Sequence, residues 1–480
     1  MNMQIHETRF NAPAFATLPR PQPVAIAGKK VLVLGLGDSG LSVARWVSRE
    51  GGAARVADTR ERPPRLAALS EVAGAEARCG TFSPHLLDGM DLVCVSPGLS
   101  LEEPVVREAV ARGLPVVGDV EIFAWAIARK GRGKVLSITG TNGKTTVTSL
   151  TGHLLRGAGF DAEVAGNISP PVLDALSARI DAGRLPEVWV LELSSYQLET
   201  TWSLAPDAAA MLNLSEDHLD RYPAFEAYGA AKARVFEGAA LQVLNRDDPH
   251  SLAMAVRGRR QITFGLDAPP GDADFGCVSV KGATWIAQGS NPLIAVEALP
   301  IHGWHNAANA MAALALAHSV GAIFAPLVDA LVAFRGLPHR LEKVATIDGV
   351  DYYDDSKGTN VGATIAALHG LARRVVLIAG GAGKGQDFTP LAAAIAKYAR
   401  KVLLIGTDAQ LIAAALKPAG VSIEFSRSLE EAVSVAAREA RPGDAVLLSP
   451  ACASFDMFRD YRHRGEVFTR AVQAREAKNG

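Results

Sequence analysis

Short, unbroken runs of Val, Leu, Ile and Ala recur along the chain, and each ends in glycine or polar residues. Such runs predict strands that are covered on both faces, because a strand with one face in water would alternate apolar and polar positions. Stretches in which apolar residues recur at helical spacing separate the runs. Strands and helices that alternate in this way predict an α/β fold built on parallel sheets.

The first block of this pattern spans residues 29–122. The predicted elements are a strand at 29–37, a helix at 39–51 that ends at a glycine, and later strands or strand ends at 54–60, 91–98 and 114–123. Residues 1–28 precede the block, carry charges and several prolines, and lack an apolar core segment. We therefore expect them to form a flexible N-terminal tail and not a signal peptide.

Two further blocks follow, at 123–336 and 337–480. The second has apolar runs at 134–139, 187–193 and 208–212 and Ala-rich helices near 306–335. The third has a hairpin-like stretch at 344–356 and buried runs at 373–381, 401–407 and 444–452. The sequence thus predicts three α/β domains: a Rossmann-like N-terminal domain, a P-loop ATPase-type central domain and a Rossmann-like C-terminal domain.

Composition narrows the class of protein. The chain has 480 residues, of which 49% are hydrophobic, so it can bury several cores. The formal net charge of −1 gives no reason to expect nucleic acid or an anionic membrane as a partner. The four cysteines are scattered and form no CxxC pair, which argues against a zinc site and against a disulfide framework.

The most specific motif is TGTNGKTT at residues 139–146, between a predicted strand and a predicted helix. The backbone N–H groups of such a turn surround phosphate oxygens, and the helix N-terminus adds a favourable field. Lys144 would reach the β- and γ-phosphates, and the Thr145 hydroxyl would hold Mg²⁺. The usual pattern has a glycine five positions before Gly143, where this chain has Ile138. We therefore expect a variant phosphate-binding loop in preference to an ordinary turn.

Three polar side chains of the second block are candidates for the same site. Glu192 ends an apolar run, where an acid can bind Mg²⁺ directly or through water. His218 lies in an acid-rich turn after another run, and Lys232 lies fourteen residues further on in a predicted helix. A structural histidine and a lysine on a solvated face are the ordinary alternatives. The residues themselves favour a functional Glu192, whereas for His218 and Lys232 they favour the ordinary alternatives over a functional role.

Gly35, Gly37 and Gly40 follow the first strand in the spacing GxGxxG, and Asp58 follows the second strand. NAD enzymes bind a pyrophosphate and a ribose hydroxyl with this arrangement. Glycines are also needed where a strand and a helix pack closely. No later stretch supplies a hydride-transfer site, whereas a complete ATP motif follows. We therefore expect a different nucleotide diphosphate here, and an NAD-linked oxidoreductase is the alternative.

Polar residues end three strands of the third block. They lie in DSKGTN at 355–360, GGAGK at 380–384 and SPACAS at 449–454. Because the carboxyl ends of parallel strands meet at one sheet edge, these stretches would lie together. Their Ser, Thr and Lys side chains suit a small anionic substrate.

Together these motifs resemble those of the Mur ligase family, over nearly the whole chain from about residue 29. The shared stretches are TGTNGKTT, ELSSYQLE (192–199), SEDHLDRY (215–222), AAK (230–232), HNAAN (305–309) and LPHRLE (337–342). DSKGTN, with SPACASFDMF (449–458), is similar to the members that add D-glutamate. The family architecture implies a UDP-substrate-binding domain, an ATP-binding central domain and an amino-acid-binding C-terminal domain, with the boundaries given above.

The resemblance implies an ADP-forming acid–D-amino-acid ligase of peptidoglycan precursor synthesis. The γ-phosphate of ATP would pass to the carboxylate of UDP-N-acetylmuramoyl-L-alanine, which gives an acyl phosphate and ADP. The amine of D-glutamate would then attack the carbonyl, and phosphate would leave. The protein would contribute positioning and charge neutralisation. The implied cofactors are ATP, two Mg²⁺ ions and a CO₂-derived carbamate on Lys232.

The resemblance also assigns roles by position. The catalytic residues would be Lys144, Glu192, His218, Lys232 as N6-carboxylysine, and Asn167, and the metal ligands would be Thr145, Glu192, His218 and Lys232. ATP would be bound by Gly140, Thr141, Asn142, Gly143, Lys144, Thr145, Thr146, His305, Asn306, Asn309, Arg340 and Asp355. The UDP-substrate would contact Gly37, Asp38, Ser39, Asp58, Thr59, Arg60, Ser96 and Gly98. D-glutamate would contact Lys357, Thr359, Lys384, Ser454 and Tyr461.

Two other hypotheses remain beside this one and the oxidoreductase. A sister ligase of the same family would add a different amino acid, which the DSKGTN stretch argues against. A P-loop regulatory or motor ATPase would hydrolyse ATP without any amino acid. For the leading hypothesis we expect a monomer in the bacterial cytoplasm, without membrane insertion and without a nucleic-acid partner.

Overall fold

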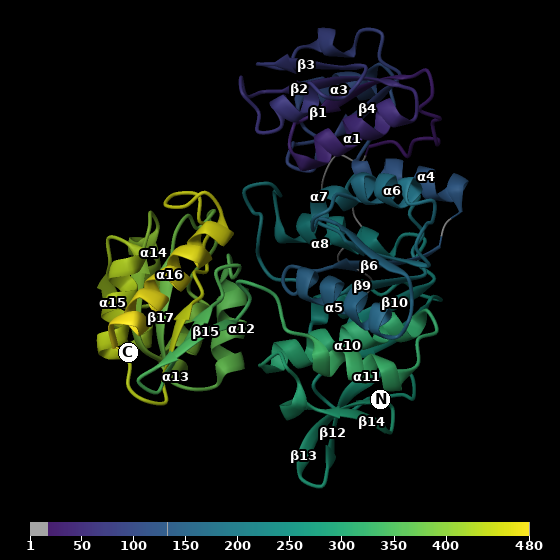
Figure 1. Cartoon of the computed structure of the whole chain (residues 1–480). Helices are drawn as coiled ribbons and strands as arrows, with labels where there is room; N and C mark the ends of the chain where they lie inside the picture. The colour runs from purple at the N-terminus through teal and green to yellow at the C-terminus, as the bar shows by residue number, and fades with distance from the viewer. Residues whose placement is uncertain (1–17, 132, 480) are drawn as a thin grey trace.

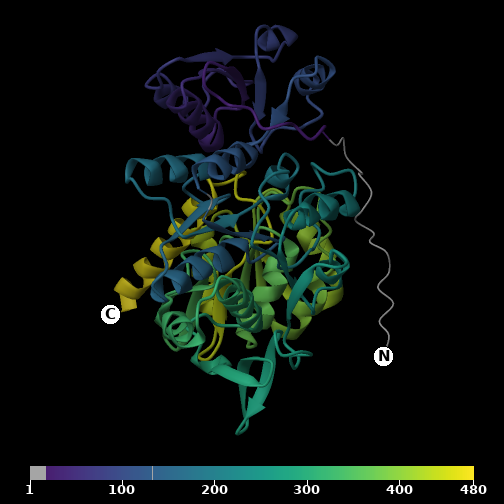
Figure 2. The same cartoon turned by 90° about the vertical axis from the view of Figure 1, so that its right-hand side faces the viewer.

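The computed structural model describes residues 18–131 and 133–479, which form three separate sheets (Figures 1 and 2). Figure 1 places the first domain (purple) above the central domain (teal) and the third domain (green to yellow) beside the central one. Each sheet is mostly parallel and carries helices. The predicted α/β class and the three-domain architecture are confirmed.

The first sheet has five parallel strands in the order β3-β2-β1-β4-β5. The strands are β1 (Lys30–Leu34), β2 (Ala53–Asp58), β3 (Ala75–Cys79), β4 (Leu92–Val95) and β5 (Val116–Val117). The helices are α1 (Asp38–Arg49), α2 (Leu66–Leu69), η1 (Pro84–Leu87), α3 (Pro104–Ala111) and α4 (Asp119–Lys130). The apolar run near 114–123 is only briefly a strand, because it turns into α4 after Gly118.

The structure describes only part of the predicted N-terminal tail, and that part is not flexible chain. Residues 1–17 lie outside the described residues, but Leu18 and Ile26 are buried in the first domain. Leu18 contacts the core on one face of the sheet, and Ile26 contacts the core on the other face. Residues 18–28 therefore pack along this domain and do not extend from it, because their few apolar side chains find sites on its surface.

The central sheet has nine strands in the order β14-β13-β12-β11-β10-β9-β6-β8-β7. The strands are β6 (Lys134–Thr139), β7 (Ala162–Gly166), β8 (Val188–Glu192), β9 (Ala208–Met211), β10 (Leu241–Asn245), β11 (Arg260–Phe264), β12 (Phe275–Val280), β13 (Ala283–Gln288) and β14 (Asn291–Ala295). The helices are α5 (Lys144–Gly157), α6 (Val172–Asp181), α7 (Ser195–Leu198), α8 (Phe225–Ala233), α9 (Pro249–Ala253), α10 (Trp304–Ser319) and α11 (Phe324–Ala333). The two predicted Ala-rich helices are α10 and α11, which pack against α5.

The antiparallel ribbon of β12, β13 and β14 was not predicted. It extends the central sheet at one end and projects from the domain in Figure 1. Its strands are mostly half-buried and mix polar with apolar residues, so they lack the continuous apolar runs that mark the other strands.

Helix α4 joins the first domain to the central one. Most of its residues are buried, and one apolar core contains residues of both domains, among them Trp46 and Trp189. The Glu121 carboxylate is buried and accepts hydrogen bonds from Trp125 Nε1 and from the backbone N–H groups of Trp202 and Ser203. The first domain packs firmly on the central one because they share this core. The predicted boundary after residue 122 falls inside α4.

The third sheet has six strands in the order β15-β16-β20-β17-β18-β19, and only the β15–β16 hairpin is antiparallel. The strands are β15 (Glu342–Ile347), β16 (Val350–Asp354), β17 (Val375–Gly380), β18 (Ala399–Ile405), β19 (Ser422–Phe425) and β20 (Ala445–Leu448). The helices are α12 (Val361–Leu371), α13 (Leu391–Tyr398), α14 (Ala409–Ala415), α15 (Leu429–Glu439) and α16 (Tyr461–Asn479). The predicted hairpin and the three predicted strands are all present.

The glycine spacing in the first turn yields a stability prediction. A Cβ atom on Gly40 would overlap with the carbonyl oxygen of Gly35, whereas a Cβ on Gly37 would meet nothing within 4 Å. We therefore expect Gly40→Ala to destabilise the protein by ~1–3 kcal/mol, as overpacking does. Gly37→Ala is the matched control, because its φ of −97° suits any residue. Urea unfolding measures both, and equal stability of the two variants would contradict the close approach.

Candidate active site

The strand order brings the predicted site residues of the central domain together. Strand β6 lies between β8 and β9, and all three are parallel. The phosphate-binding loop follows β6, Glu192 ends β8, and the segment after β9 leads to His218. Their carboxyl ends therefore meet at one edge of the sheet, where open α/β sheets bind ligands.

The loop itself has the geometry that a phosphate-binding turn needs. Gly143 has a φ of +83°, which favours glycine, and α5 begins at the next residue. Lys144 Nζ donates to the carbonyl oxygens of Gly140 at 2.7 Å and of Thr141 at 2.9 Å. Lys232 Nζ, from α8, donates to the same Gly140 oxygen at 2.8 Å. The loop lysine and the helix lysine thus share one acceptor.

Both lysines are poorly solvated. Burial lowers the pKa of Lys144, although the charges of Glu192 and Asp217 oppose the shift. Burial lowers the pKa of Lys232 well below its ordinary value, and the nearby Lys144 charge lowers it further. Lys232 is 1% exposed, and its ammonium group lies 4.7 Å from the centre of the Tyr228 ring. Lys232 is therefore poised to be a neutral amine, unlike a lysine on a solvated helix face.

Glu192 is buried, and its two carboxylate oxygens differ. Oε1 accepts a hydrogen bond from Asn167 Nδ2 at 2.9 Å. Oε2 is buried and has no hydrogen-bond partner among the described residues. A buried carboxylate oxygen without a partner is costly unless a cation binds it, so this oxygen fits a divalent metal ion.

His218 lies in an aromatic cluster beside the loop. Its backbone has a positive φ of 57°, and its Nδ1 lies 2.8 Å from the hydroxyl oxygen of Tyr196. Its ring also packs edge-on against Tyr228, whose hydroxyl lies 3.2 Å from Thr141 Oγ1. Burial and the neighbouring lysine charges lower its pKa, which favours a neutral ring with a free nitrogen lone pair.

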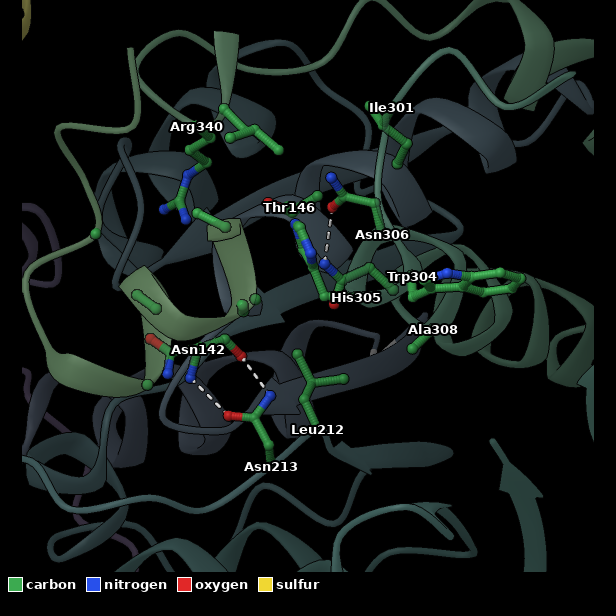
Figure 3. A pocket seen from close by; sticks show the side chains of 18 of the residues that line it. Asn142, Thr146, Leu212, Asn213, Ile301, Trp304, His305, Asn306, Ala308 and Arg340 are labelled. Carbon is green, nitrogen blue, oxygen red and sulfur yellow. Dashed lines mark hydrogen bonds between the residues drawn. The ribbon is translucent and has the colours of Figure 1, made fainter. Parts of the chain in front are cut away.

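A cavity of about 440 Å³ begins at the phosphate-binding loop and runs between the central and third domains (Figure 3). The central domain lines it with Asn142, Gly143, Thr146, His305, Asn306 and Asn309, and the third domain with Arg340, Asp355 and Lys357. These are predicted ATP or substrate residues from distant parts of the sequence. The cavity is large enough for a nucleotide and has a polar end at the loop.

The far end of the cavity is more apolar. Phe264, Ile301 and Trp304 contribute to its wall, and Trp304 is 45% exposed. His305 lies against Gly303 and Gly370, and burial lowers its pKa to about 4. A neutral, partly apolar wall of this kind suits a flat heteroaromatic ring.

The cationic groups of the third domain face the loop of the central one. Burial lowers the pKa of Lys357 to about 8, with further lowering by the charges of Arg340 and Lys144. Lys357 Nζ lies 4.0 Å from the centre of the Tyr461 ring. Burial raises the pKa of Asp355 to about 7, and this carboxylate accepts from Ser449 Oγ at 2.8 Å.

The other predicted D-glutamate residues lie at the same edge of the third sheet. Ser454 is buried after β20, and Lys384 follows β17 with a φ of 55°. The positive charge of Lys384 is close enough to lower the pKa of His218. Thr359 precedes the N-cap of α12. The third domain therefore directs this edge towards the central site.

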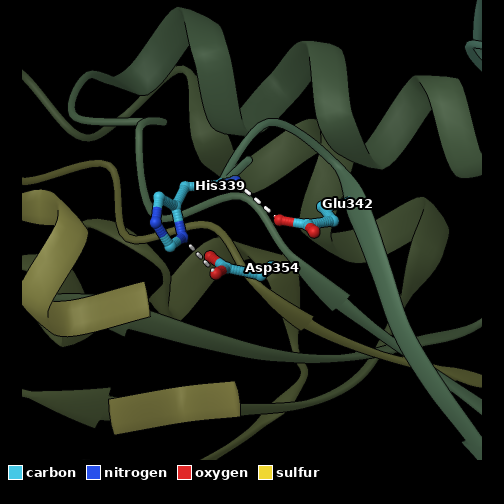
Figure 4. A group of neighbouring side chains, drawn as sticks. All are labelled: His339, Glu342 and Asp354. Atoms are coloured by element: carbon cyan, nitrogen blue, oxygen red, sulfur yellow. Dashed lines mark hydrogen bonds and ion pairs between the residues drawn. The ribbon is translucent and has the colours of Figure 1, made fainter. Parts of the chain in front are cut away.

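A cluster of three side chains lies where the third domain begins, just after the segment that leads from the central domain (Figure 4). His339 Nδ1 lies 2.7 Å from Asp354 Oδ2, and Glu342 accepts a hydrogen bond from the His339 backbone at 2.9 Å. These side chains lie within 4.8 Å of one another, but the hydrogen bonds engage them with each other. We assign them to holding Arg340, the next residue, in place.

The glycine turn of the first domain presents the N-terminus of α1. Gly37 is the N-cap of this helix, and the next residue, Asp38, pairs with Arg65 at 2.6 Å. Ser96 Oγ donates to the Gly35 carbonyl at 3.1 Å, which ties the turn to the end of β4. Gly98 follows close by, so the predicted UDP-substrate residues lie around one strand edge. None of the residues that line the cavity described above belongs to this domain.

Asp58 is fully engaged within its own domain. Its carboxylate accepts from the backbone N–H groups of Leu36 and Arg60 and from Arg60 Nε and Nη2. These four hydrogen bonds use all the lone pairs of the carboxylate, which leaves none for a ribose hydroxyl. Of the three residues predicted for this segment, only Thr59 and Arg60 are exposed.

Sequence reasoning missed several residues of the site. Asn213 Oδ1 accepts from the Asn142 backbone N–H at 2.8 Å, and its Nδ2 donates to the Asn142 carbonyl at 3.0 Å (Figure 3). Asn360, Tyr196 and Trp304 also have no predicted role. The only available signals were that Asn213 follows an apolar run and that Asn360 precedes a helix, where it serves as the N-cap.

Comparison with known proteins identifies the class. Residues 29–118 match the Mur ligase MurD-like N-terminal domain, residues 138–317 the Mur ligase middle domain and residues 339–452 the Mur ligase glutamate ligase domain. The chain therefore belongs to the Mur ligase family, as its motifs predicted.

Curated relatives cover almost the whole chain. A UDP-N-acetylmuramoylalanine–D-glutamate ligase of Nitrosospira multiformis is 54% identical over 457 residues, which are 94% of this chain and 97% of that protein. The ligase of the same name from Methylobacillus flagellatus is 55% identical over 445 residues, which are 92% and 96% of the two chains.

Solved structures share the fold at low identity. UDP-N-acetylmuramate–alanine ligase MurC from Thermotoga maritima has a TM-score of 0.59 at 20% identity and covers 93% of this chain and 99% of its own. MurF from Acinetobacter baumannii has a TM-score of 0.60 at 16% identity and covers 94% and 91%. Within residues 18–131 and 133–479, no helix has the length and apolar character needed to cross a membrane.

The state of Asp58 predicts how stability depends on pH. Its hydrogen bonds to Arg60 lower its pKa from 3.8 to about 2. The ionised form thus stabilises the folded state above pH 3.8, and this contribution is lost as the pH falls towards 2. We expect Asp58→Asn to lower the free energy of unfolding at pH 7 by ~1–3 kcal/mol, and by progressively less below pH 4.

Urea unfolding of the first domain, followed by hydrogen exchange of the peptide around Leu36, measures this difference. Arg65→Ala is the control, because Arg65 pairs with exposed Asp38 and not with Asp58. A difference between wild type and Asp58→Asn that stayed constant from pH 7 to pH 3 would contradict the assignment.

Proposed function

We propose that this protein adds D-glutamate to UDP-N-acetylmuramoyl-L-alanine with cleavage of ATP to ADP, through an acyl phosphate. The convergence of Lys144 and Lys232 on the Gly140 carbonyl, beside a cavity shared by two domains, carries the proposal. The names of the curated relatives support the choice of substrates. The reaction belongs to peptidoglycan precursor synthesis in the bacterial cytoplasm, and we take the working unit to be the monomer.

ATP fits the cavity between the central and third domains. The phosphate-binding loop, residues 140–146, holds the phosphates at the polar end, with Lys144 against the β- and γ-phosphates. Asn306 and Asn309 lie along the wall towards the apolar end, where the adenine binds near His305. Arg340 and Asp355 reach the nucleotide from the third domain.

The first chemical step makes the acyl phosphate. A carboxylate oxygen of UDP-N-acetylmuramoyl-L-alanine attacks the γ-phosphorus, a new P–O bond forms, and the bond to the ADP oxygen breaks. Negative charge moves from the transferring group to ADP. Lys144, Arg340 and Lys357 surround this position with positive charge, and Asn167 orients the reacting carboxylate from beside Glu192.

Two divalent metal sites fit the described residues. The unpartnered Oε2 of Glu192 and the hydroxyl of Thr145 would hold one Mg²⁺, and His218 with a carbamate on Lys232 would hold another. Mg²⁺ supplies charge neutralisation at the phosphate oxygens. His218 is oriented for this role by Tyr196, whose hydroxyl contacts the opposite ring nitrogen.

Lys232 is suited to carbamylation. Its buried amine has a lowered pKa, so the neutral form that attacks CO₂ is accessible. The ammonium group first loses a proton; the neutral nitrogen then bonds to the carbon of CO₂, one C=O π bond breaks, and a second proton leaves, so that a cation would become an anion. The product places a carboxylate-like group between the loop and His218, where a metal ligand is needed.

The second step forms the amide. The neutral amine of D-glutamate attacks the acyl carbon, the C–N bond forms, the C–O bond to phosphate breaks, and the nitrogen loses one proton to the leaving phosphate. The cationic and hydroxyl groups at the third-domain edge suit the two carboxylates of D-glutamate. These groups belong to Lys357, Thr359, Lys384, Ser454 and Tyr461. Phosphate leaves with the oxygen that came from the carboxylate.

The first domain holds the other end of the UDP-substrate. The turn at 35–40 and the start of α1 suit a diphosphate, since helix N-termini favour anions. Ser39, Thr59, Arg60, Ser96 and Gly98 border the same edge. We infer that the sugar nucleotide binds there, with its alanyl carboxylate directed towards the phosphate-binding loop.

Phosphate release tests the proposed function. Release should require ATP, UDP-N-acetylmuramoyl-L-alanine and D-glutamate together, and L-alanine, meso-diaminopimelate or L-lysine should not replace D-glutamate. Lys144→Ala should lose at least ~100-fold in kcat, because it removes a donor aimed at developing charge. Lys417→Ala is the control, because Lys417 is an exposed residue of the third domain and has no predicted role in the site. Release without D-glutamate would refute the ligase function.

Chemical rescue tests the carbamate. Lys232→Ala should lose most activity and recover part of it with added formate, acetate or propionate, because the buried site left by the side chain admits a short carboxylate. Lys144→Ala should not be rescued. With ¹³C-bicarbonate, the wild type should show a carbamate carbon by NMR that Lys232→Ala lacks. A fully active Lys232→Ala, or a wild type without this signal, would contradict the role.

A further inference from the structure

A pair of side-chain amides joins the third domain directly to the phosphate-binding loop. Asn360 Nδ2 donates to Asn142 Oδ1 at 3.0 Å, and Asn142 Nδ2 donates to Asn360 Oδ1 at 3.2 Å. Two amides that exchange both bonds hold each other at a set distance and angle. This residue pair therefore fixes the N-terminal end of α12 against the loop.

Asn360 uses its whole hydrogen-bonding capacity. Besides the pair with Asn142, its Nδ2 donates to Asp217 Oδ2 at 3.2 Å, and its Oδ1 accepts from the Ala363 backbone N–H at 2.9 Å as the N-cap of α12. Its two N–H groups and both lone pairs of its oxygen are thus occupied. The residue is 3% exposed, so opening the domains would break these bonds and solvate the amide.

The chain of amides continues into the central sheet. The backbone N–H and carbonyl of Asn142 are held by the Asn213 side chain, which follows β9. On the other side, a Cβ on Gly362 would lie 3.1 Å from Ser215 Oγ and 3.3 Å from Asn142 Nδ2, so the first turn of α12 is seated tightly on the central domain. The contact runs from one sheet, through the loop, to the other domain.

We propose that Asn360 is a positioning residue that locks the third domain closed over the phosphate-binding loop. It ends the DSKGTN stretch, so its attachment to Asn142 also sets where Lys357 and Thr359 stand relative to Lys144. This proposal rests on the function proposed above and specifies how the third domain is positioned for it. Asn360 acts through those neighbours and does not itself touch the transferring phosphate.

Two substitutions separate the lock from the helix cap. Asn360→Ser keeps a good N-cap but is too short to reach Asn142 and Asp217. Asn360→Asp also keeps the cap and nearly the original shape, yet it replaces the donor with a carboxylate beside the Asp217 carboxylate. A purely structural role predicts that Asp is tolerated at least as well as Ser. If Asn360 locks the domains, Asn360→Asp should be less active than Asn360→Ser.

We expect Asn360→Ser to lower kcat by roughly ten-fold, ~1.4 kcal/mol, and to raise the KM for D-glutamate. Asn360→Asp should lower kcat further and raise the KM for D-glutamate further. The KM for the UDP-substrate should stay within about two-fold, since that substrate is bound by another domain. Ser428→Ala is the matched control, because it removes the N-cap of α15, which packs against α16, β17 and β18 of the third domain.

Solution scattering and a double-mutant cycle complete the test. With a non-hydrolysable ATP analogue and UDP-N-acetylmuramoyl-L-alanine, Asn360→Ser should have a larger radius of gyration than wild type. In the cycle with Asn142→Ala, the losses in kcat should be less than multiplicative. Wild-type kinetics and compactness of Asn360→Ser, or independent losses in the cycle, would overturn the lock. Absence of D-glutamate-dependent phosphate release in the wild type would instead overturn the proposed function.

Discussion

The arrangement of the candidate active site depends on the carbonyl oxygen of Gly140, because this oxygen accepts hydrogen bonds from both Lys144 and Lys232. Burial lowers the pKa of both amines, and the charge of Lys144 lowers the pKa of Lys232 further. One amine belongs to the loop that binds phosphate and the other to α8. This shared contact joins nucleotide binding to the lysine that would carry the carbamate.

Three sheets bring the rest of the site to this point. The order β9-β6-β8 places the loop between the segments that carry Glu192 and His218. Helix α4 fixes the first domain through a common core, whereas the Asn142–Asn360 pair links the third domain to the central one. In the function proposed above, the first domain positions the sugar nucleotide, and the third domain brings the amino-acid site over ATP.

The sequence predicted the features that local patterns carry. The phosphate-binding loop, the buried strands and the acid at the end of β8 each have a signature within a few residues. The sequence could not predict that the Asp58 carboxylate accepts hydrogen bonds from Leu36 and Arg60, because these bonds depend on how the backbone turns after β1 and β2. The amide pair of Asn142 and Asn360 joins residues of different domains, and the ribbon β12–β14 lacks an apolar run.

The fate of oxygen tests the central claim most directly. UDP-N-acetylmuramoyl-L-alanine labelled with ¹⁸O in its alanyl carboxylate should give, after one turnover with ATP and D-glutamate, inorganic phosphate that carries one ¹⁸O, and an amide that keeps the other. Mass spectrometry of the phosphate measures this. Phosphate without ¹⁸O would show that the carboxylate never bonded to phosphorus and would contradict the account.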